Sequence, residues 1–141
     1  MTGRGKRTYP LYSVAKILIV DDEAQIAEVL KDYLVAAGHE VIVCLDSTKG
    51  ESVIADEKPD LAVFDYQMPG KSGTELLANV RSGLNMRRIP VIFVSGTTPL
   101  LYSSQVPREA RVRFLSKPVD ADSLLAAVTE LLNPEGWSTA H

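Results

Sequence analysis

The sequence predicts an α/β domain in three layers, a doubly wound (βα)5 arrangement with a parallel sheet in the middle. Two observations carry this prediction. Five short runs of β-favouring residues alternate with segments whose apolar residues recur at helical spacing. Four of the five runs are almost unbroken in apolar character, as is typical of strands buried on both faces. Such alternation is typical of a parallel sheet whose strands are connected by helices.

The expected strands are short and rich in valine, isoleucine, leucine and phenylalanine. They are residues 17–20, 41–45, 61–64, 91–94 and 112–115. Right-handed crossovers place the carboxyl ends of all parallel strands at one edge of the sheet. Ligands of such sheets bind outside those ends, where the strand order reverses. The residues that follow each strand are therefore the first place to look for a site.

Two helices are predicted most clearly. In the first, apolar residues recur at helical spacing, and these are Ile26, Val29, Leu30, Tyr33, Leu34 and Ala37. Gly38 follows them as a stop signal. The last helix begins after Asp120 as N-cap, carries Leu124, Leu125, Val128, Leu131 and Leu132 on one face, and ends before Asn133 and Pro134.

The helical signal is weaker in three other segments. Residues 48–56 fit a helix that contains Gly50, and residues 74–81 fit one with Leu76, Leu77 and Val80 facing inward. Between residues 94 and 112, Pro99 and Pro107 disfavour a long helix. We expect one or two short turns there.

Composition excludes several classes of protein. The chain has 141 residues, of which 45% are apolar, so one compact domain buries an ordinary core without disulfides. With 23% charged residues and a net charge of −3, no overall field marks it for nucleic acid or an anionic membrane. Cys44 is the single cysteine, which suits a reduced thiol and a cytoplasmic location. No apolar run approaches the roughly 20 residues that span a bilayer.

Chemistry-bearing side chains follow four of the predicted strands. The ends read Asp21-Asp22-Glu23, Asp65, Ser95 and Ser116-Lys117-Pro118. Each alone has a structural explanation, such as an acidic first helical turn or a surface lysine. Their joint occurrence at successive strand ends, in the order acid, acid, hydroxyl and lysine, points to a shared site.

These residue types form a coherent chemical set. Crowded carboxylates oppose one another's ionisation unless a cation is present, and Mg²⁺ prefers such hard oxygen ligands. Asp22 and Asp65 are the first choices as direct ligands, with Asp21 direct or through water. A carboxylate beside the ion can attack phosphorus and form an aspartyl phosphate on Asp65. Lys117 would then neutralise the phosphoryl oxygens, and Ser95 would donate a hydrogen bond to one of them.

The same residues resemble the response-regulator receiver family over about residues 16–132. Residues 17–23, ILIVDDE, look like the first strand with its acidic pair. The stretch from Asp65 through Met68-Pro69 to Gly73 resembles the phosphoacceptor loop. Val94-Ser95-Gly96 resembles the end of the fourth strand, and residues 114–118, FLSKP, resemble the lysine motif after the fifth.

The resemblance implies several features of the fold and site. The strand order would be the flavodoxin-like 2-1-3-4-5, and the Lys117-Pro118 peptide bond would be cis. Mg²⁺ would be held by Asp22, Asp65 and the backbone carbonyl of Gln67. In the family's switch, the hydroxyl at the position of Ser95 moves toward the phosphoryl group and the aromatic at the position of Phe114 rotates inward.

The resemblance also implies partners and a domain layout. The donor would be a histidine kinase or a histidine phosphotransfer protein, and the output a downstream effector protein, with no direct contact to nucleic acid or membrane. Activity would be limited to self-catalysed phosphoryl transfer and autodephosphorylation. We expect a lead-in over residues 1–15, a receiver domain over 16–133 and a tail over 134–141, too short for an output domain. Dimerisation is a further habit of the family.

Other functions fit less well. A dinucleotide- or flavin-binding module needs a glycine or hydroxyl cradle where this chain has Asp21-Asp22-Glu23. A phosphatase with an aspartyl nucleophile needs a second acid two residues later, where Gln67 stands. His39 follows the stop at Gly38 and belongs at the other edge of the sheet, so it forms no triad with Ser95. A receiver-like interaction scaffold that works without phosphorylation stays open.

The region before the fifth strand departs from the family pattern. Glu109-Ala110-Arg111 stands where a small Gly-Ala pair is common, and Arg108, Arg111 and Arg113 make the region basic. The basic face is either solvated or a docking surface for an acidic partner.

Overall fold

The computed structural model describes residues 14–67, 75, 78–79, 89–96 and 111–133. Within them, five parallel strands form one sheet in the order β2-β1-β3-β4-β5. The strands are β1 Lys16–Val20, β2 Glu40–Cys44, β3 Leu61–Asp65, β4 Val91–Ser95 and β5 Val112–Ser116. This confirms the predicted strands to within one residue at each end, and it confirms the predicted strand order.

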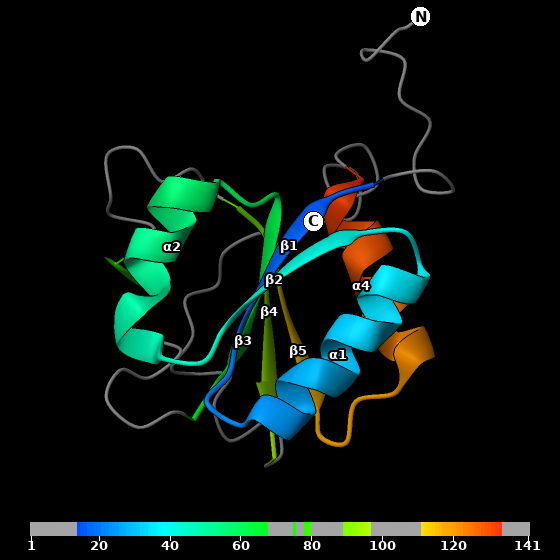
Figure 1. Ribbon diagram of the computed structural model, residues 1–141. Helices are drawn as coiled ribbons and strands as arrows, with labels where there is room; N and C mark the ends of the chain where they lie inside the picture. The colour runs from blue at the N-terminus through cyan, green and yellow to red at the C-terminus, as the bar shows by residue number, and fades with distance from the viewer. Residues whose placement is uncertain (1–13, 68–74, 76–77, 80–88, 97–110, 134–141) are drawn as a thin grey trace, which may run out of the picture.

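Helices cover both faces of the sheet, as predicted. Helices α1 (Ala24–Ala36) and α4 (Ala121–Leu132) lie on one face and α2 (Gly50–Glu57) on the other (Figure 1). The N-cap of α4 is confirmed, because the Asp120 side chain accepts a hydrogen bond of 2.7 Å from the Ser123 backbone N–H. In the segment 74–81, the described residues 75, 78 and 79 are helical. The rest of that segment and the proline-containing segment 97–110 lie outside the described residues.

The helix predicted at residues 48–56 begins with a 3₁₀ turn, η2, at Ser47–Lys49. Asp46 sets this start, because one of its carboxylate oxygens accepts hydrogen bonds from the backbone N–H and the hydroxyl of Thr48, at 2.9 and 2.6 Å. Such a side-chain contact two residues ahead favours a tight turn over a regular first helical turn. The α-helix therefore starts only at Gly50.

Helix α1 ends where the sequence predicts, at a glycine in a left-handed conformation. Gly38 has φ +97°, its N–H donates to the Val35 carbonyl at 2.9 Å, and the His39 N–H donates to the Leu34 carbonyl at 3.1 Å. This pair of bonds satisfies the last carbonyls of the helix.

The buried stripe of α1 is narrower than the apolar spacing predicts. Ala27, Leu30 and Leu34 are buried, whereas Val29 is 46% exposed and Ala37 is also exposed. A helix that packs on a sheet with one side buries only the residues directly above the strands. Helical spacing therefore overestimates this buried face.

Burial of the strands follows their place in the sheet. All of β3 and β4 and nearly all of β1 are buried, while β2 and β5 are mostly half-buried. The apolar run at residues 41–45 suggests a strand buried on both faces, but it forms an edge strand, and Leu45 lies beyond its end with 48% exposure. Strand order, which the apolar run does not reveal, decides this difference.

Alternate strand residues build two separate cores. Residues of β1, β3 and β4 that face α1 and α4 form one cluster, which includes Ile19, Val63 and Val94. The opposite face packs toward α2 and contains a row of phenylalanines, Phe64, Phe93 and Phe114, paired across β3, β4 and β5. This period of two is expected for a pleated strand with both faces covered.

At the amino ends of the strands, His39 joins two segments of the chain. Its Nδ1 accepts a hydrogen bond of 3.0 Å from the Ala15 backbone N–H, just before β1. The predicted position, at the edge opposite the carboxyl ends, agrees with this contact, although the ring is half-buried. Burial lowers the pKa of His39 below its ordinary value of 6.5, because the charged form is less well solvated.

We predict that stability falls on acidification through titration of His39. Between the lowered pKa of His39 in the folded protein and 6.5, the unfolded chain binds more protons than the folded one. The contribution of neutral His39 to the free energy of unfolding is therefore complete above pH 6.5 and is lost as pH falls through the pKa of the folded state. Ring NMR of the two histidines, His39 and His141, together with urea unfolding across this range, measures both effects. His39→Asn keeps an acceptor without titrating and should flatten the profile. A His39 ring that titrates at or above 6.5 would contradict the prediction.

Candidate functional site

Three carboxylates meet at the carboxyl ends of β1 and β3. Asp21 and Asp22 follow β1 directly, and Asp65 is the last residue of β3. Each offers one oxygen, and these oxygens all lie within 4.8 Å of one another. Asp21 and Asp65 are buried, with 1% and 4% exposure, whereas Asp22 is exposed. The predicted convergence of these residues is confirmed.

Asp21 has one satisfied and one unsatisfied oxygen. Its Oδ1 accepts a hydrogen bond of 2.9 Å from the Glu23 backbone N–H, whereas its Oδ2 is buried and has no hydrogen-bond partner among the residues that the structure describes. Burial raises the pKa of Asp21 to about 6, the Glu23 N–H opposes this, and the negative charge of Asp65 adds to it. A buried carboxylate oxygen without a partner beside two further carboxylates suits a cation ligand.

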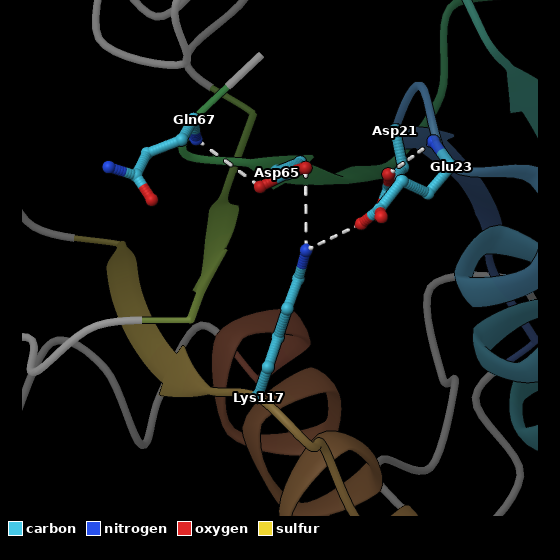
Figure 2. A network of polar contacts seen from close by, with 5 residues as sticks. All are labelled: Asp21, Glu23, Asp65, Gln67 and Lys117. Atoms are coloured by element: carbon cyan, nitrogen blue, oxygen red, sulfur yellow. Dashed lines mark hydrogen bonds and ion pairs between the residues drawn. The ribbon is translucent and has the colours of Figure 1, made fainter.

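Asp65 is held from two sides (Figure 2). Its Oδ1 accepts a hydrogen bond of 3.2 Å from the Gln67 N–H, and its Oδ2 lies 3.4 Å from the Lys117 Nζ. Burial raises the pKa of Asp65, and the nearby Lys117 and the Gln67 N–H offset part of that rise. The carboxylate is therefore oriented at the sheet edge with a cationic group in front of one oxygen.

Lys117 reaches the acidic cluster from the end of β5. Its backbone N–H donates to the Ser95 carbonyl at 2.7 Å, which ties the turn after β5 to the end of β4. The Lys117-Pro118 peptide bond is cis, as predicted. Partial burial lowers the pKa of Lys117, but the carboxylates of Asp65, Asp21 and Glu23 outweigh it and leave the pKa raised. The ammonium form is thus the resting form.

Ser95 and Phe114 lie in neighbouring strands at and near the same edge. Ser95 ends β4 and is 1% exposed. At Gly96, a Cβ would meet nothing within 4 Å, so the space beside the hydroxyl-bearing residue is open. Phe114 is half-buried, with its ring centroid 5.3 Å from that of Phe93 and 5.8 Å from that of Tyr66.

Two residues at this site escape prediction from the sequence. Tyr66 reads as part of a polar turn, but it is 5% exposed, and its ring centroid lies 5.4 Å from that of Phe93. Glu23 reads as part of an acidic first turn, but its Oε1 lies 3.4 Å from the Lys117 Nζ. The signal for Tyr66 is an aromatic residue directly after a buried strand. For Glu23, the signal is a third acid at the sheet edge that also carries a lysine.

Two arginines of the basic region, Arg111 just before β5 and Arg113 within it, make contacts inside the molecule. Arg111 donates from its Nη2 to the Leu131 carbonyl at 3.1 Å, near the end of α4. Arg113 donates to both carboxylate oxygens of Glu130, at 2.6 and 3.2 Å. Cations near a helix C-terminus are favourable. These contacts connect β5 to α4, and Arg108 lies outside the described residues.

The family is decided by a match over most of the chain. Residues 17–129 match the family model of the response regulator receiver domain. The chain belongs to this family. This receiver domain is 30% identical over 119 residues to protein PilH of Pseudomonas aeruginosa, a match that covers 84% of this chain and 98% of PilH. It is 32% identical over 120 residues to the phosphate regulon transcriptional regulatory protein PhoB of the same organism, covering 85% of this chain.

Solved structures agree with this assignment. A response regulator receiver domain protein from Clostridium thermocellum superposes with a TM-score of 0.73 at 28% identity, covering 86% of this chain and 97% of that one. Among the curated relatives, this receiver domain spans 52% of the length of PhoB and 24% of the length of the response regulator protein FleR of Pseudomonas aeruginosa.

Membership defines the general role of this receiver domain in two-component signalling. Receiver domains are signalling domains that interact with histidine kinases and effectors and generally bind Mg²⁺ at an acidic pocket. The acidic cluster of Asp21, Asp22 and Asp65 occupies the corresponding sheet edge. Within the described part of the chain, no helix combines the length and the apolar character that a membrane crossing requires.

Proposed function

We propose that this receiver domain accepts a phosphoryl group on Asp65, with Mg²⁺, from a phosphohistidine protein. One observation carries the proposal: a buried Asp65 carboxylate has the Lys117 ammonium 3.4 Å from one oxygen, and Asp21 and Asp22 beside it. This arrangement pairs a nucleophile with a cation for the phosphoryl oxygens and with carboxylates for a metal ion.

The acidic cluster fits Mg²⁺. Asp21, Asp22 and Asp65 would hold the ion together with the backbone carbonyl of Gln67, Asp21 either directly or through water. The buried Oδ2 of Asp21, which has no hydrogen-bond partner among the described residues, and the two neighbouring carboxylates support this assignment. When bound, Mg²⁺ supplies positive charge that neutralises the carboxylates and the phosphoryl oxygens.

Asp65, Lys117 and Ser95 have different roles in the proposed phosphoryl transfer. A carboxylate oxygen of Asp65 attacks phosphorus, an oxygen–phosphorus bond forms, and the bond from phosphorus to the donor histidine nitrogen breaks with its electron pair left on nitrogen. Lys117 stays protonated and donates to the phosphoryl oxygens, in keeping with its raised pKa. The Ser95 hydroxyl, at the next strand end, donates to another of them. Positioning and charge carry this step, as in other phosphoryl transfers.

Ser95 and Phe114 are proposed to carry the signal outward. Ser95 moves toward the phosphoryl group, and Phe114 rotates further into the aromatic cluster. Phe114 is half-buried and already contacts Phe93 and Tyr66. It has no hydroxyl, so its two positions differ by burial of the ring and not by a hydrogen bond.

The layout and partners follow from the receiver assignment. We propose a receiver domain over residues 16–133, flanked by a lead-in over 1–15 and a tail over 134–141. The phosphodonor is a histidine kinase or histidine phosphotransfer protein, and the recipient of the signal is an effector protein in the cytoplasm. A homodimer would use the fourth and fifth helices of the receiver fold, as is the habit of the family. Neither nucleic acid nor membrane is bound directly.

Incubation with a small phosphodonor tests the proposed function. Acetyl phosphate with Mg²⁺ should add one phosphoryl group to the wild-type protein, visible by intact mass and removed by hydroxylamine, as an acyl phosphate is. The same incubation in EDTA should give no adduct. An unmodified protein in saturating Mg²⁺, or an adduct that forms equally in EDTA, would argue against the proposal. The alternative, an interaction scaffold that acts without phosphorylation, would then be tested by a search for partners that bind the unphosphorylated protein.

A further inference from the structure

The Lys117 ammonium is shared between two carboxylates. Its Nζ lies 3.4 Å from the Asp65 Oδ2 and also 3.4 Å from the Glu23 Oε1. Figure 2 marks both contacts with dashed lines. Both distances exceed the roughly 2.7–2.9 Å of a close charge-assisted hydrogen bond. Neither carboxylate therefore holds the ammonium fully.

The two carboxylates differ in their surroundings. The Asp65 side chain is 4% exposed and that of Glu23 is 58% exposed, while Lys117 lies between them at 20%. The contact of Glu23 with Lys117 is therefore the one that water and salt weaken most. The backbone of Glu23 is nevertheless anchored, because its N–H donates to the Asp21 Oδ1 at 2.9 Å. That bond keeps the Glu23 side chain within reach of Lys117.

We propose that Glu23 restrains Lys117 in the unphosphorylated state and thereby opposes phosphoryl uptake on Asp65. The inference rests on the proposed function. A phosphoryl group on Asp65 brings strong acceptor oxygens and about two negative charges to the ammonium. Lys117 must then turn toward these oxygens, and its contact with Glu23 is stretched or lost. Glu23 is a positioning residue, because it acts through Lys117 and does not touch the reacting atoms.

Two substitutions at Glu23 separate the contact from the charge. Glu23→Gln removes the charge and with it the ion pair, and leaves at most a neutral acceptor for Lys117. Glu23→Asp keeps the negative charge but shortens the side chain by one carbon–carbon bond, roughly 1.5 Å, which takes the carboxylate out of reach of Lys117. In saturating Mg²⁺ and low salt, both should raise the rate of phosphorylation by acetyl phosphate and the affinity for beryllofluoride by about two- to fivefold, the range of a partly exposed ion pair.

Salt and a matched control sharpen the comparison. The advantage of both variants over wild type should shrink in about 1 M salt, where screening acts within a few ångströms. Glu28→Gln removes the same charge from the exposed side of α1, where the Glu28 Oε2 lies 3.8 Å from the Lys31 Nζ. This control should be phosphorylated at the wild-type rate. If Glu23→Asp behaves like wild type while Glu23→Gln is faster, charge alone acts and the restraint is wrong.

A readout without phosphorylation tests the contact itself. In EDTA, unfolding of wild type, Glu23→Gln, Lys117→Met and the double variant forms a cycle. The proposal expects that the two substitutions do not change the free energy of unfolding additively. The unfolding constant of the double variant should differ by about two- to fivefold from the product of the two single effects. Additive changes in the free energy of unfolding would show that Glu23 and Lys117 do not interact. If wild type is phosphorylated and the Glu23 variants are phosphorylated at the same rate, only the proposed restraint by Glu23 is wrong. If wild type is not phosphorylated, the proposed function and the restraint are both wrong.

Discussion

Replacing Asp65 by asparagine is expected to reduce phosphoryl incorporation from acetyl phosphate to background. The carboxylate oxygen that faces Lys117 at 3.4 Å becomes part of an amide, which is not a nucleophile toward phosphorus. The shape of the side chain is almost unchanged, and an amide oxygen still accepts the hydrogen bond from the Gln67 N–H. The lost function would therefore reflect lost chemistry and not lost structure. Intact mass after incubation in saturating Mg²⁺ measures it.

The matched control for this variant is Asp60→Asn. Asp60 lies at the amino end of the sheet, where its Oδ2 accepts a hydrogen bond of 2.8 Å from the Lys16 N–H, and asparagine keeps an acceptor there. The control should incorporate phosphoryl at the wild-type rate. If Asp65→Asn is modified as fast as wild type, or if peptide mapping places the wild-type adduct elsewhere, Asp65 is not the acceptor. Circular dichroism of both variants confirms that they are folded.

Replacing Asp21 by asparagine is expected to stabilise the metal-free protein and to weaken its stabilisation by Mg²⁺. The pKa of Asp21 is raised from 3.8 to about 6, chiefly by burial, so ionisation of this carboxyl group destabilises the folded protein. Asparagine removes this cost, so we expect a gain of about 1–3 kcal/mol in the free energy of unfolding at pH 7 in EDTA. Urea denaturation measures the change.

The pH dependence of this gain has a definite sign. Between 3.8 and about 6, the folded protein holds a proton on Asp21 that the unfolded chain releases, so ionisation lowers wild-type stability as pH rises through this range. The Asp21→Asn variant lacks this step. Its advantage over wild type should therefore grow from about pH 4 to about pH 6 and stay constant above. An advantage that shrinks over this range would contradict the interpretation.

Mg²⁺ should offset much of the stability advantage of Asp21→Asn over wild type. An ion that binds only the folded state adds about 2.7 kcal/mol at one hundred times its dissociation constant. Wild type should gain this stability, whereas Asp21→Asn should gain much less, because a carboxylate proposed to hold the ion directly or through water has been replaced. Asp32→Asn, an exposed acid on α1, serves as control and should change stability by less than about 0.5 kcal/mol. Equal Mg²⁺ stabilisation of wild type and Asp21→Asn would remove Asp21 from the metal site.

Much of this site is predictable because chain connectivity leaves few alternatives. Parallel strands with right-handed crossovers must bring Asp21, Asp65, Ser95 and Lys117 to one edge, whatever the details of packing. The stop of α1 at Gly38 and the N-cap of α4 at Asp120 are also readable, because both depend on interactions within a few residues.

Predictions that depend on neighbours distant in the chain are less successful. Val29 has the right spacing for the buried face of α1 but is 46% exposed, and the run at residues 41–45 looks fully buried but lies at the sheet edge. Spacing shows that a residue lies on an apolar stripe. It does not show how much of that stripe a neighbouring element covers.

The amino-acid sequence alone thus determined the alternation of strands and helices and the types of side chain at the strand ends. Only the tertiary structure decided that Lys117 stands between Asp65 and Glu23, which are 52 and 94 residues away in the chain. It also decided that one Asp21 oxygen is buried with no hydrogen-bond partner in the described part of the chain. The reason is physical. Local propensities and connectivity act over a few residues at a time, whereas a contact of 3.4 Å depends on strand order, register and side-chain conformation together.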